Sequence, residues 1–75
     1  MQIRVKLMGV LKEKTPPDGT LNVPDDATVA SVLEQLKIDP GLVQACTVNG
    51  QWVRDRSRVL ADGDELVVLP PVGGG

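Results

Sequence analysis

Hydrophobic and polar residues alternate in two short segments near the start of the chain. Residues 3–7 alternate between apolar and basic side chains, which predicts a strand with one buried face. Residues 21–23 alternate again and stop at Pro24, which predicts a short second strand. The loop between them holds two prolines and a glycine, and because the strands are close in sequence we expect them to pair as a hairpin.

The hydrophobic period then lengthens to three or four residues. Four apolar residues fall on one face of an amphipathic helix: Val29, Val32, Leu33 and Leu36. Asp26 or Thr28 can cap its first turn, and we expect Pro40 and Gly41 to end it. Because valine is a mediocre helix former, this helix should depend on packing against the sheet.

Strand patterns return in the second half of the chain. Residues 45–48 lead into Asn49 and Gly50, a pair that tolerates positive φ and therefore predicts a tight hairpin with residues 51–53. Residues 59–60 are expected to return briefly to the core.

A turn at residues 62–64 leads into the last strand, residues 65–69, which the prolines at 70 and 71 terminate. The resulting order, β-β-α-β-β-β, predicts an α+β protein with the β-grasp, or ubiquitin-like, fold. We expect a mixed sheet of four to five strands packed on one helix, with the first and last strands as parallel central neighbours. Residues 1–72 would form this domain, and residues 73–75 a flexible glycine tail.

Composition narrows the possible functions. The 75-residue chain has no histidine, tyrosine or phenylalanine, and its single cysteine is Cys46. Imidazole-dependent catalysis is therefore excluded, and neither a disulfide within the chain nor a metal site is expected. A net charge of -2 with dispersed basic residues argues against nucleic-acid binding. The apolar runs are too short to span a membrane and no leader is visible, so we expect a cytoplasmic protein.

The C-terminal segment carries a resemblance to a known family. The sequence DGDE at 62–65, an apolar strand and PPVGGG at 70–75 resemble the MoaD/ThiS sulfur carriers. The segments VNG at 48–50 and ATV at 27–29 are also similar, so the resemblance covers the whole chain. The PPV before the glycines favours the molybdopterin synthase small subunit over the thiamine carrier.

The resemblance implies a carrier and not an enzyme. A ubiquitin-activating-type adenylyltransferase would use ATP to adenylate the terminal carboxylate of Gly75, and a sulfur donor enzyme would then convert it to a thiocarboxylate. A large synthase subunit would accept the tail, and the sulfur would enter molybdopterin or, next, the thiazole of thiamine. No cofactor would be bound. Gly73 and Gly74 lack side chains and suit a narrow channel, while Pro70 and Pro71 would keep the base of the tail extended.

Strand parity predicts a surface for these partners. In the last strand Leu66 and Val68 would point inward, whereas Val67 and Leu69 would point outward. We call three outward apolar residues, Met8, Val67 and Leu69, the docking patch. Four further residues would flank or extend it toward the tail: Arg4, Lys6, Pro70 and Pro71. The alternative is that a loop or Trp52 covers the patch.

Two other functions stay open on the residues alone. The chain could be a ubiquitin-like protein-binding module that docks through the sheet face with an inert tail, or a modifier conjugated to lysines. Other noticeable residues have simpler interpretations. Cys46 has the parity of a small core residue, Arg54, Arg56 and Arg58 form a solvated connector, and the acidic residues at 62–65 form a turn.

Overall fold

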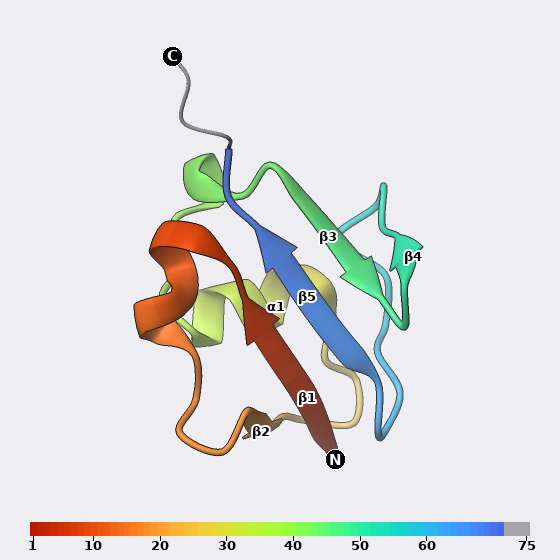
Figure 1. Ribbon diagram of the computed structural model, residues 1–75. Coiled ribbons are helices and arrows are strands. Elements are labelled where there is room, and N and C mark those ends of the chain that lie inside the picture. The colour runs from red at the N-terminus through yellow and green to blue at the C-terminus, as the bar shows by residue number, and fades with distance from the viewer. Residues whose placement is uncertain (72–75) are drawn as a thin grey trace.

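Five strands form one mixed sheet in the computed structural model, which describes residues 1–71 (Figure 1). The strands are β1 (Gln2–Leu7), β2 (Thr20–Asn22), β3 (Ala45–Val48), β4 (Gln51–Trp52) and β5 (Glu65–Leu69). They lie in the order β2-β1-β5-β3-β4, and β1 and β5 run parallel at the centre while the other neighbours are antiparallel. The predicted β-grasp topology is confirmed. The predicted tail at 73–75, with Val72, lies outside the described residues.

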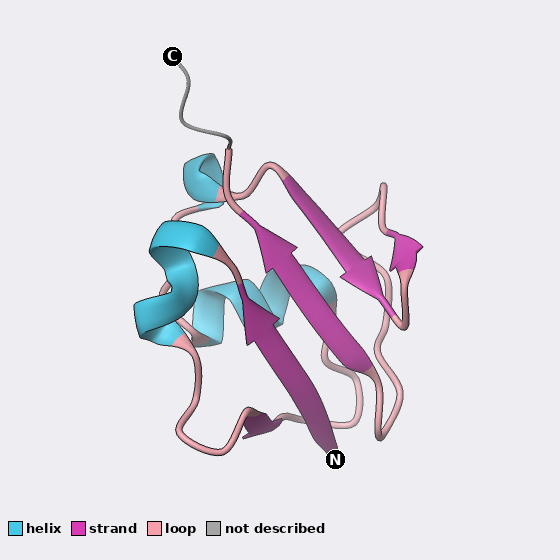
Figure 2. Ribbon diagram, in the orientation of Figure 1, coloured by secondary structure: helices cyan, strands magenta, loops and turns pink. Residues whose placement is uncertain are grey.

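One face of the sheet is covered by the helix α1 (Val29–Gln35), which lies behind the strands in Figure 2. The inward residues of β1, β3 and β5 meet the buried side of this helix, and all are at most 4% exposed: Ile3, Val5, Leu7, Cys46, Val48, Leu66, Val68, Val29, Val32 and Leu33. This single core holds the domain together, as the alternating pattern predicts. No helix within residues 1–71 is long and apolar enough to cross a membrane.

The helix begins where the sequence suggests and ends sooner. Thr28 is the N-cap: its hydroxyl accepts a hydrogen bond from the Ser31 N–H at 3.1 Å, and the Ser31 hydroxyl accepts one from the Thr28 N–H at 2.8 Å. The end predicted at Pro40 and Gly41 is wrong, because Lys37 already has a positive φ of 60°. The two residues instead lie in a separate 3-10 helix, η2 (Pro40–Leu42).

A second 3-10 helix, η1 (Gly9–Lys14), lies between β1 and β2, where the sequence pattern predicts no helix. It begins at Gly9, whose φ of +55° suits a residue without a side chain, and it buries Leu11 in the core. The predicted contribution of residues 59–60 to the core holds only in part. Leu60 is buried, but Val59 is 59% exposed and forms an isolated bridge with Thr28.

Candidate functional site

The side of the sheet away from α1 carries the residues predicted to dock a partner. We call this side the open face and define it by the outward residues of β1, β5, β3 and β4, together with Met8: Gln2, Arg4, Lys6, Met8, Glu65, Val67, Leu69, Ala45, Thr47 and Trp52. Lys6 pairs with Val67, and Val67 pairs with Thr47 on its other side. Neighbouring strands lie about 4.8 Å apart, so the face is a continuous surface.

The predicted parity of β5 is confirmed by its burial. Leu66 and Val68 are fully buried, whereas Val67 and Leu69 are half-buried on the open face. Met8 directly follows β1, is 38% exposed and donates its N–H to the Val68 carbonyl at 3.1 Å. The structure therefore brings the three residues of the docking patch together at the ends of two adjacent parallel strands.

The basic residues beside the patch are exposed, as predicted. Arg4 pairs with Glu65 across β1 and β5, and its guanidinium lies 4.0 Å from the Glu65 carboxylate. Such an exposed pair contributes only about 0–1 kcal/mol to stability, so it leaves Arg4 available to a partner. Lys6 makes no ion pair among residues 1–71. Glu65 was not among the predicted site residues, although its parity with Val67 and Leu69 places it on this face.

Trp52 also belongs to the open face, which sequence reasoning considered only in the alternative that Trp52 covers the docking patch. The two-residue turn at Asn49 and Gly50, with φ of 52° and 83°, pairs Trp52 with Thr47. This register was the available signal, because residues opposite each other share a face. At 69% exposed, Trp52 extends the face at its β4 edge.

The base of the tail is held against the start of η1. Pro70 is half-buried and Pro71 is exposed, and the Gln44 N–H donates to the Leu69 carbonyl at 2.8 Å. A Cβ atom on Gly9 would lie 2.9 Å from the Pro70 Cγ, so the two residues are in close contact. Any larger residue at position 9 would displace Pro70. Gly75, whose carboxylate is the predicted reacting group, and the predicted tail residues Gly73 and Gly74 lie beyond the described residues.

Cys46 is a core residue, as predicted. It is 2% exposed and pairs with Val68 on the buried side of the sheet. Burial raises the pKa of its thiol, and the positive charge of Arg56 opposes this only in part. A thiol that stays protonated and enclosed is a poor nucleophile, so the side chain does not contribute a reactive group to the site.

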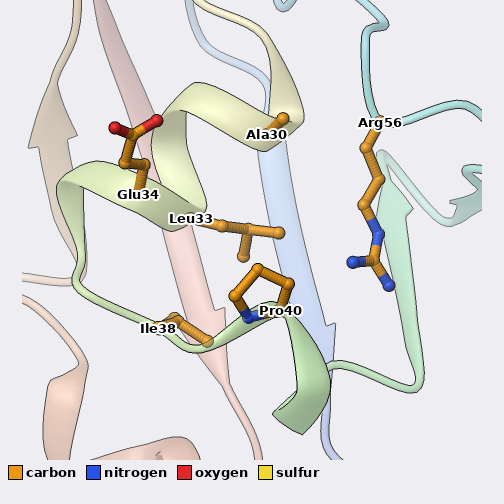
Figure 3. Close-up of a pocket in the computed structure, with 6 residues that line it drawn as sticks. All are labelled: Ala30, Leu33, Glu34, Ile38, Pro40 and Arg56. Atoms are coloured by element: carbon orange, nitrogen blue, oxygen red, sulfur yellow. The ribbon is translucent and has the colours of Figure 1, made fainter.

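Arg56 corrects the prediction of a fully solvated connector. It is half-buried, and its guanidinium donates a hydrogen bond to the Val43 carbonyl at 3.0 Å. It borders a pocket of about 330 Å³ on the helix side of the molecule, where Leu33, Ile38 and Pro40 form an apolar wall (Figure 3). Arg54 and Arg58 are exposed, as expected.

Asp62 and Asp64 lie in the predicted turn, whereas Glu65 is already the first residue of β5. The Asp64 carboxylate accepts hydrogen bonds from the Ala61 N–H and from the Asn49 side chain, both at 2.8 Å. Asp62 accepts one from the Gln2 N–H at 2.9 Å. These bonds tie the turn to the β3–β4 hairpin and to β1. Within residues 1–71 there is no cluster of three or more His, Cys, Asp or Glu side chains arranged for a metal ion.

The strand order and the single covering helix define a ubiquitin-like β-grasp protein. Its central strand β5 is also its last, so the C-terminal residues follow directly from the middle of the sheet. The sequence matches the ThiS family over residues 5–75, and the chain belongs to that family. It is 34% identical over 82 residues to the molybdopterin synthase sulfur carrier subunit of Arabidopsis thaliana, covering 100% of this chain and 84% of that relative.

Two solved structures are similar along nearly the whole chain. One is the small archaeal modifier protein 1 of H. volcanii, with a TM-score of 0.71 and 25% identity over 95% of this chain and 98% of the other. The other is a chain in the complex of subunits 1 and 2 of the molybdopterin-converting factor from Helicobacter pylori 26695. There the TM-score is 0.65 and the identity 27%, and both chains are covered completely.

Proposed function

We propose that this chain is a sulfur carrier of the molybdopterin synthase type. The observation that carries the proposal is the match to the sulfur carrier subunit from Arabidopsis thaliana, which spans all 75 residues at 34% identity. The ThiS family match supports it, because that match runs through the final glycines. Molybdopterin is the first candidate for the product that receives the sulfur, and the thiazole of thiamine is the alternative.

The reacting group in this proposal is the carboxylate of Gly75. A carboxylate is a poor acyl donor, so a partner adenylyltransferase first uses ATP to form an acyl adenylate and release pyrophosphate. A persulfide on a sulfur donor enzyme then displaces AMP, and a thiol reduces the resulting acyl disulfide to leave a thiocarboxylate. The chain supplies no catalytic side chain, and ATP is bound by the partner. Glycines 73–75 allow a narrow channel to accept the tail.

The docking patch supplies recognition in the same proposal. Met8, Val67 and Leu69 form an apolar surface next to Pro70, and Arg4 and Lys6 add positive charge at its edge. An apolar centre with a charged rim suits a protein interface. The complex of two molybdopterin-converting factor subunits supports a large synthase subunit as one partner. The adenylyltransferase and that subunit would use the patch in turn, since both must reach the tail.

Reconstitution tests the proposal directly. The purified chain is incubated with ATP, a cognate adenylyltransferase and a persulfide donor, and its intact mass is then measured. We expect the mass increase of one oxygen replaced by sulfur, located on the C-terminal peptide. A variant lacking Gly74 and Gly75 is the control, and it should stay unmodified while its thermal unfolding is unchanged. An unmodified full chain, in the presence of an adenylyltransferase active on another carrier, contradicts the proposal.

A second candidate function is protein modification, favoured by the likeness to the small archaeal modifier protein 1. A modifier would form an amide bond between Gly75 and a lysine of another protein, with AMP as the leaving group. Affinity-tagged chain expressed in cells should then appear in higher-mass adducts that resist denaturation. The adducts should vanish when Gly74 and Gly75 are deleted. A thiocarboxylate without adducts favours the carrier function alone.

A further inference from the structure

Among residues 1–71, Leu69 is the last residue of β5 that a neighbouring segment holds by a backbone hydrogen bond. On one side of β5 the Met8 N–H donates to the Val68 carbonyl at 3.1 Å. On the other side the Gln44 N–H donates to the Leu69 carbonyl at 2.8 Å. The two prolines that follow have no N–H with which to continue either ladder, so the direction of the chain after β5 depends on how the Pro70 ring packs.

The Pro70 ring packs against the backbone of Gly9, the first residue of η1. A Cβ atom at position 9 would lie 2.9 Å from the Pro70 Cγ and 3.7 Å from the Pro70 Cδ, and the first distance is shorter than a Cβ atom tolerates. Figure 1 shows the coil that follows β1 beside the C-terminal end of β5. A residue with a side chain at position 9 would therefore push the ring away from η1.

The position of Gly9 is fixed by its neighbours in the chain. Met8 bonds to β5 through its N–H, and its carbonyl accepts a hydrogen bond from the Leu11 N–H at 3.1 Å, which closes the first turn of η1. Leu11 is 1% exposed and anchors that turn in the core. Gly9 itself has a φ of +55°, which a residue without a side chain adopts at little cost. Position 9 is therefore a firm support for Pro70.

We propose that Gly9 is a positioning residue for the C-terminal segment. It lets Pro70 pack closely on η1, and this contact fixes the direction in which Pro71 leaves the domain. The role rests on the proposed carrier function, in which a partner that docks on the open face must also receive the carboxylate of Gly75. A segment that leaves in one direction brings its end to the partner's active site more often than a segment that leaves in many.

A second glycine provides the matched control. Gly19 also has a positive φ, of +70°, but a Cβ atom there would meet nothing within 4 Å. Gly9→Ala and Gly19→Ala therefore introduce a similar backbone strain, and only Gly9→Ala adds a contact with Pro70. Both variants should stay folded with a lowered thermal midpoint. A difference between them in the position of Pro70 or in activity then reports the contact and not the strain.

Residual dipolar couplings of the 13C-labelled full chain measure the direction of the segment. The probes are the Cα–Hα bonds of Pro70 and Pro71, and the couplings within β1, β3 and β5 provide the reference frame. In the wild type both proline couplings should agree with the orientation of these residues in the structure. Gly9→Ala should change both couplings, whereas Gly19→Ala should leave both as they are in the wild type.

Adenylation by excess adenylyltransferase, followed as pyrophosphate release, measures the consequence for function. Gly9→Ala should lower the maximal rate at least about fivefold, because fewer bound chains present their carboxylate to ATP. The half-saturating enzyme concentration should change less than about twofold, since the docking patch is intact. Gly19→Ala should match the wild type in both. In a Pro70→Ala background, which lacks the ring atoms next to position 9, Gly9→Ala should lower the rate less than about twofold further.

Three results would overturn the proposal. Unchanged proline couplings in Gly9→Ala would show that the ring absorbs the contact without moving the chain. Changed couplings with an unchanged maximal rate would show that the partner does not use the direction of the segment. An equal loss of rate in Gly19→Ala would assign the effect to backbone strain. A wild-type chain that is never adenylated contradicts the proposed function instead, and the couplings, which need no enzyme, then decide whether Gly9 positions Pro70 and Pro71.

Discussion

The two sides of β5 show how the same kinds of side chain serve two purposes in this domain. Leu66 and Val68 have no exposed surface, whereas Val67 and Leu69, residues of the same apolar types, stay half-exposed on the open face. The difference comes from α1, which covers only one side of the sheet. Hydrophobicity alone therefore does not separate the core from the docking patch, but strand parity does.

Val68→Asp should have the largest effect, because it places an unpaired carboxylate in the core. The cost of such a charge is several kcal/mol, comparable with the whole stability of a small domain. We expect the variant to lose cooperative thermal unfolding, measured by circular dichroism. Val67→Asp is the matched control and should stay folded, since its side chain lies on the open face.

Leu69→Asp should separate binding from folding. If Leu69 anchors the interface, a charge there should cost about 2–4 kcal/mol of affinity for the adenylyltransferase or the large subunit. Stability should change by no more than about 1 kcal/mol, because the side chain faces outward. Calorimetric titration and thermal unfolding of the same sample measure both. An unfolded Leu69→Asp beside a folded Val68→Asp would show that the two faces have been exchanged.

Thr28→Ala tests the helix that makes the two faces different. Loss of the N-cap hydroxyl should cost about 1 kcal/mol, or about 4–8 °C in the unfolding midpoint of a domain this size. Thr28→Ser keeps an oxygen that can accept from the Ser31 N–H and should lose much less. Affinity for a partner at the open face should be the same in both variants. A similar loss in both would mean that the cap is not what stabilises the helix start.

The smallest expected effect is a pH dependence from Cys46 on the buried face. Burial raises the pKa of this thiol in the folded state, so the unfolded chain releases its proton first as pH rises. The contribution of the protonated thiol to the stability of the fold is fully present below the ordinary cysteine pKa of about 8.5. This contribution is lost as pH rises through the higher pKa of the folded state.

Denaturant unfolding of the wild type and of Cys46→Ala measures this effect. The difference in the free energy of unfolding between the two proteins should change between about pH 7.5 and pH 9.5. A single titrating proton can change this free energy by at most roughly 1.4 kcal/mol per pH unit, and we expect a fraction of that slope. A difference that is constant over this range would contradict a raised pKa.

Sequence patterns were sufficient for the strands, because period two and the Asn49–Gly50 turn are local signals. They were insufficient for η1, because its one buried residue, Leu11, is followed by the charged residues 12–14 and the segment has no hydrophobic period. The early end of α1 was also missed, since Lys37 adopts a positive φ that glycine usually provides.

The candidate site divides in the same way. Parity placed Val67 and Leu69 on the open face, and it needed only the strand itself. Parity in β5 would have placed Glu65 there as well, whereas Trp52 joins that face through its pairing with Thr47, which depends on the register between strands. The half-buried position of Arg56 depends on its bond to the Val43 carbonyl, and no local pattern indicates such a contact.

The parallel pairing of β1 with β5 also fixes when this protein can fold during its synthesis. Arg4 meets Glu65 across nearly the full length of the chain, so the central pair cannot form while the ribosome is still making the second half. Until then the apolar residues of β1 lack their neighbour and stay open to chaperones or to misassembly. The residues after Leu69 are therefore presented to partners only after β5 has paired with β1.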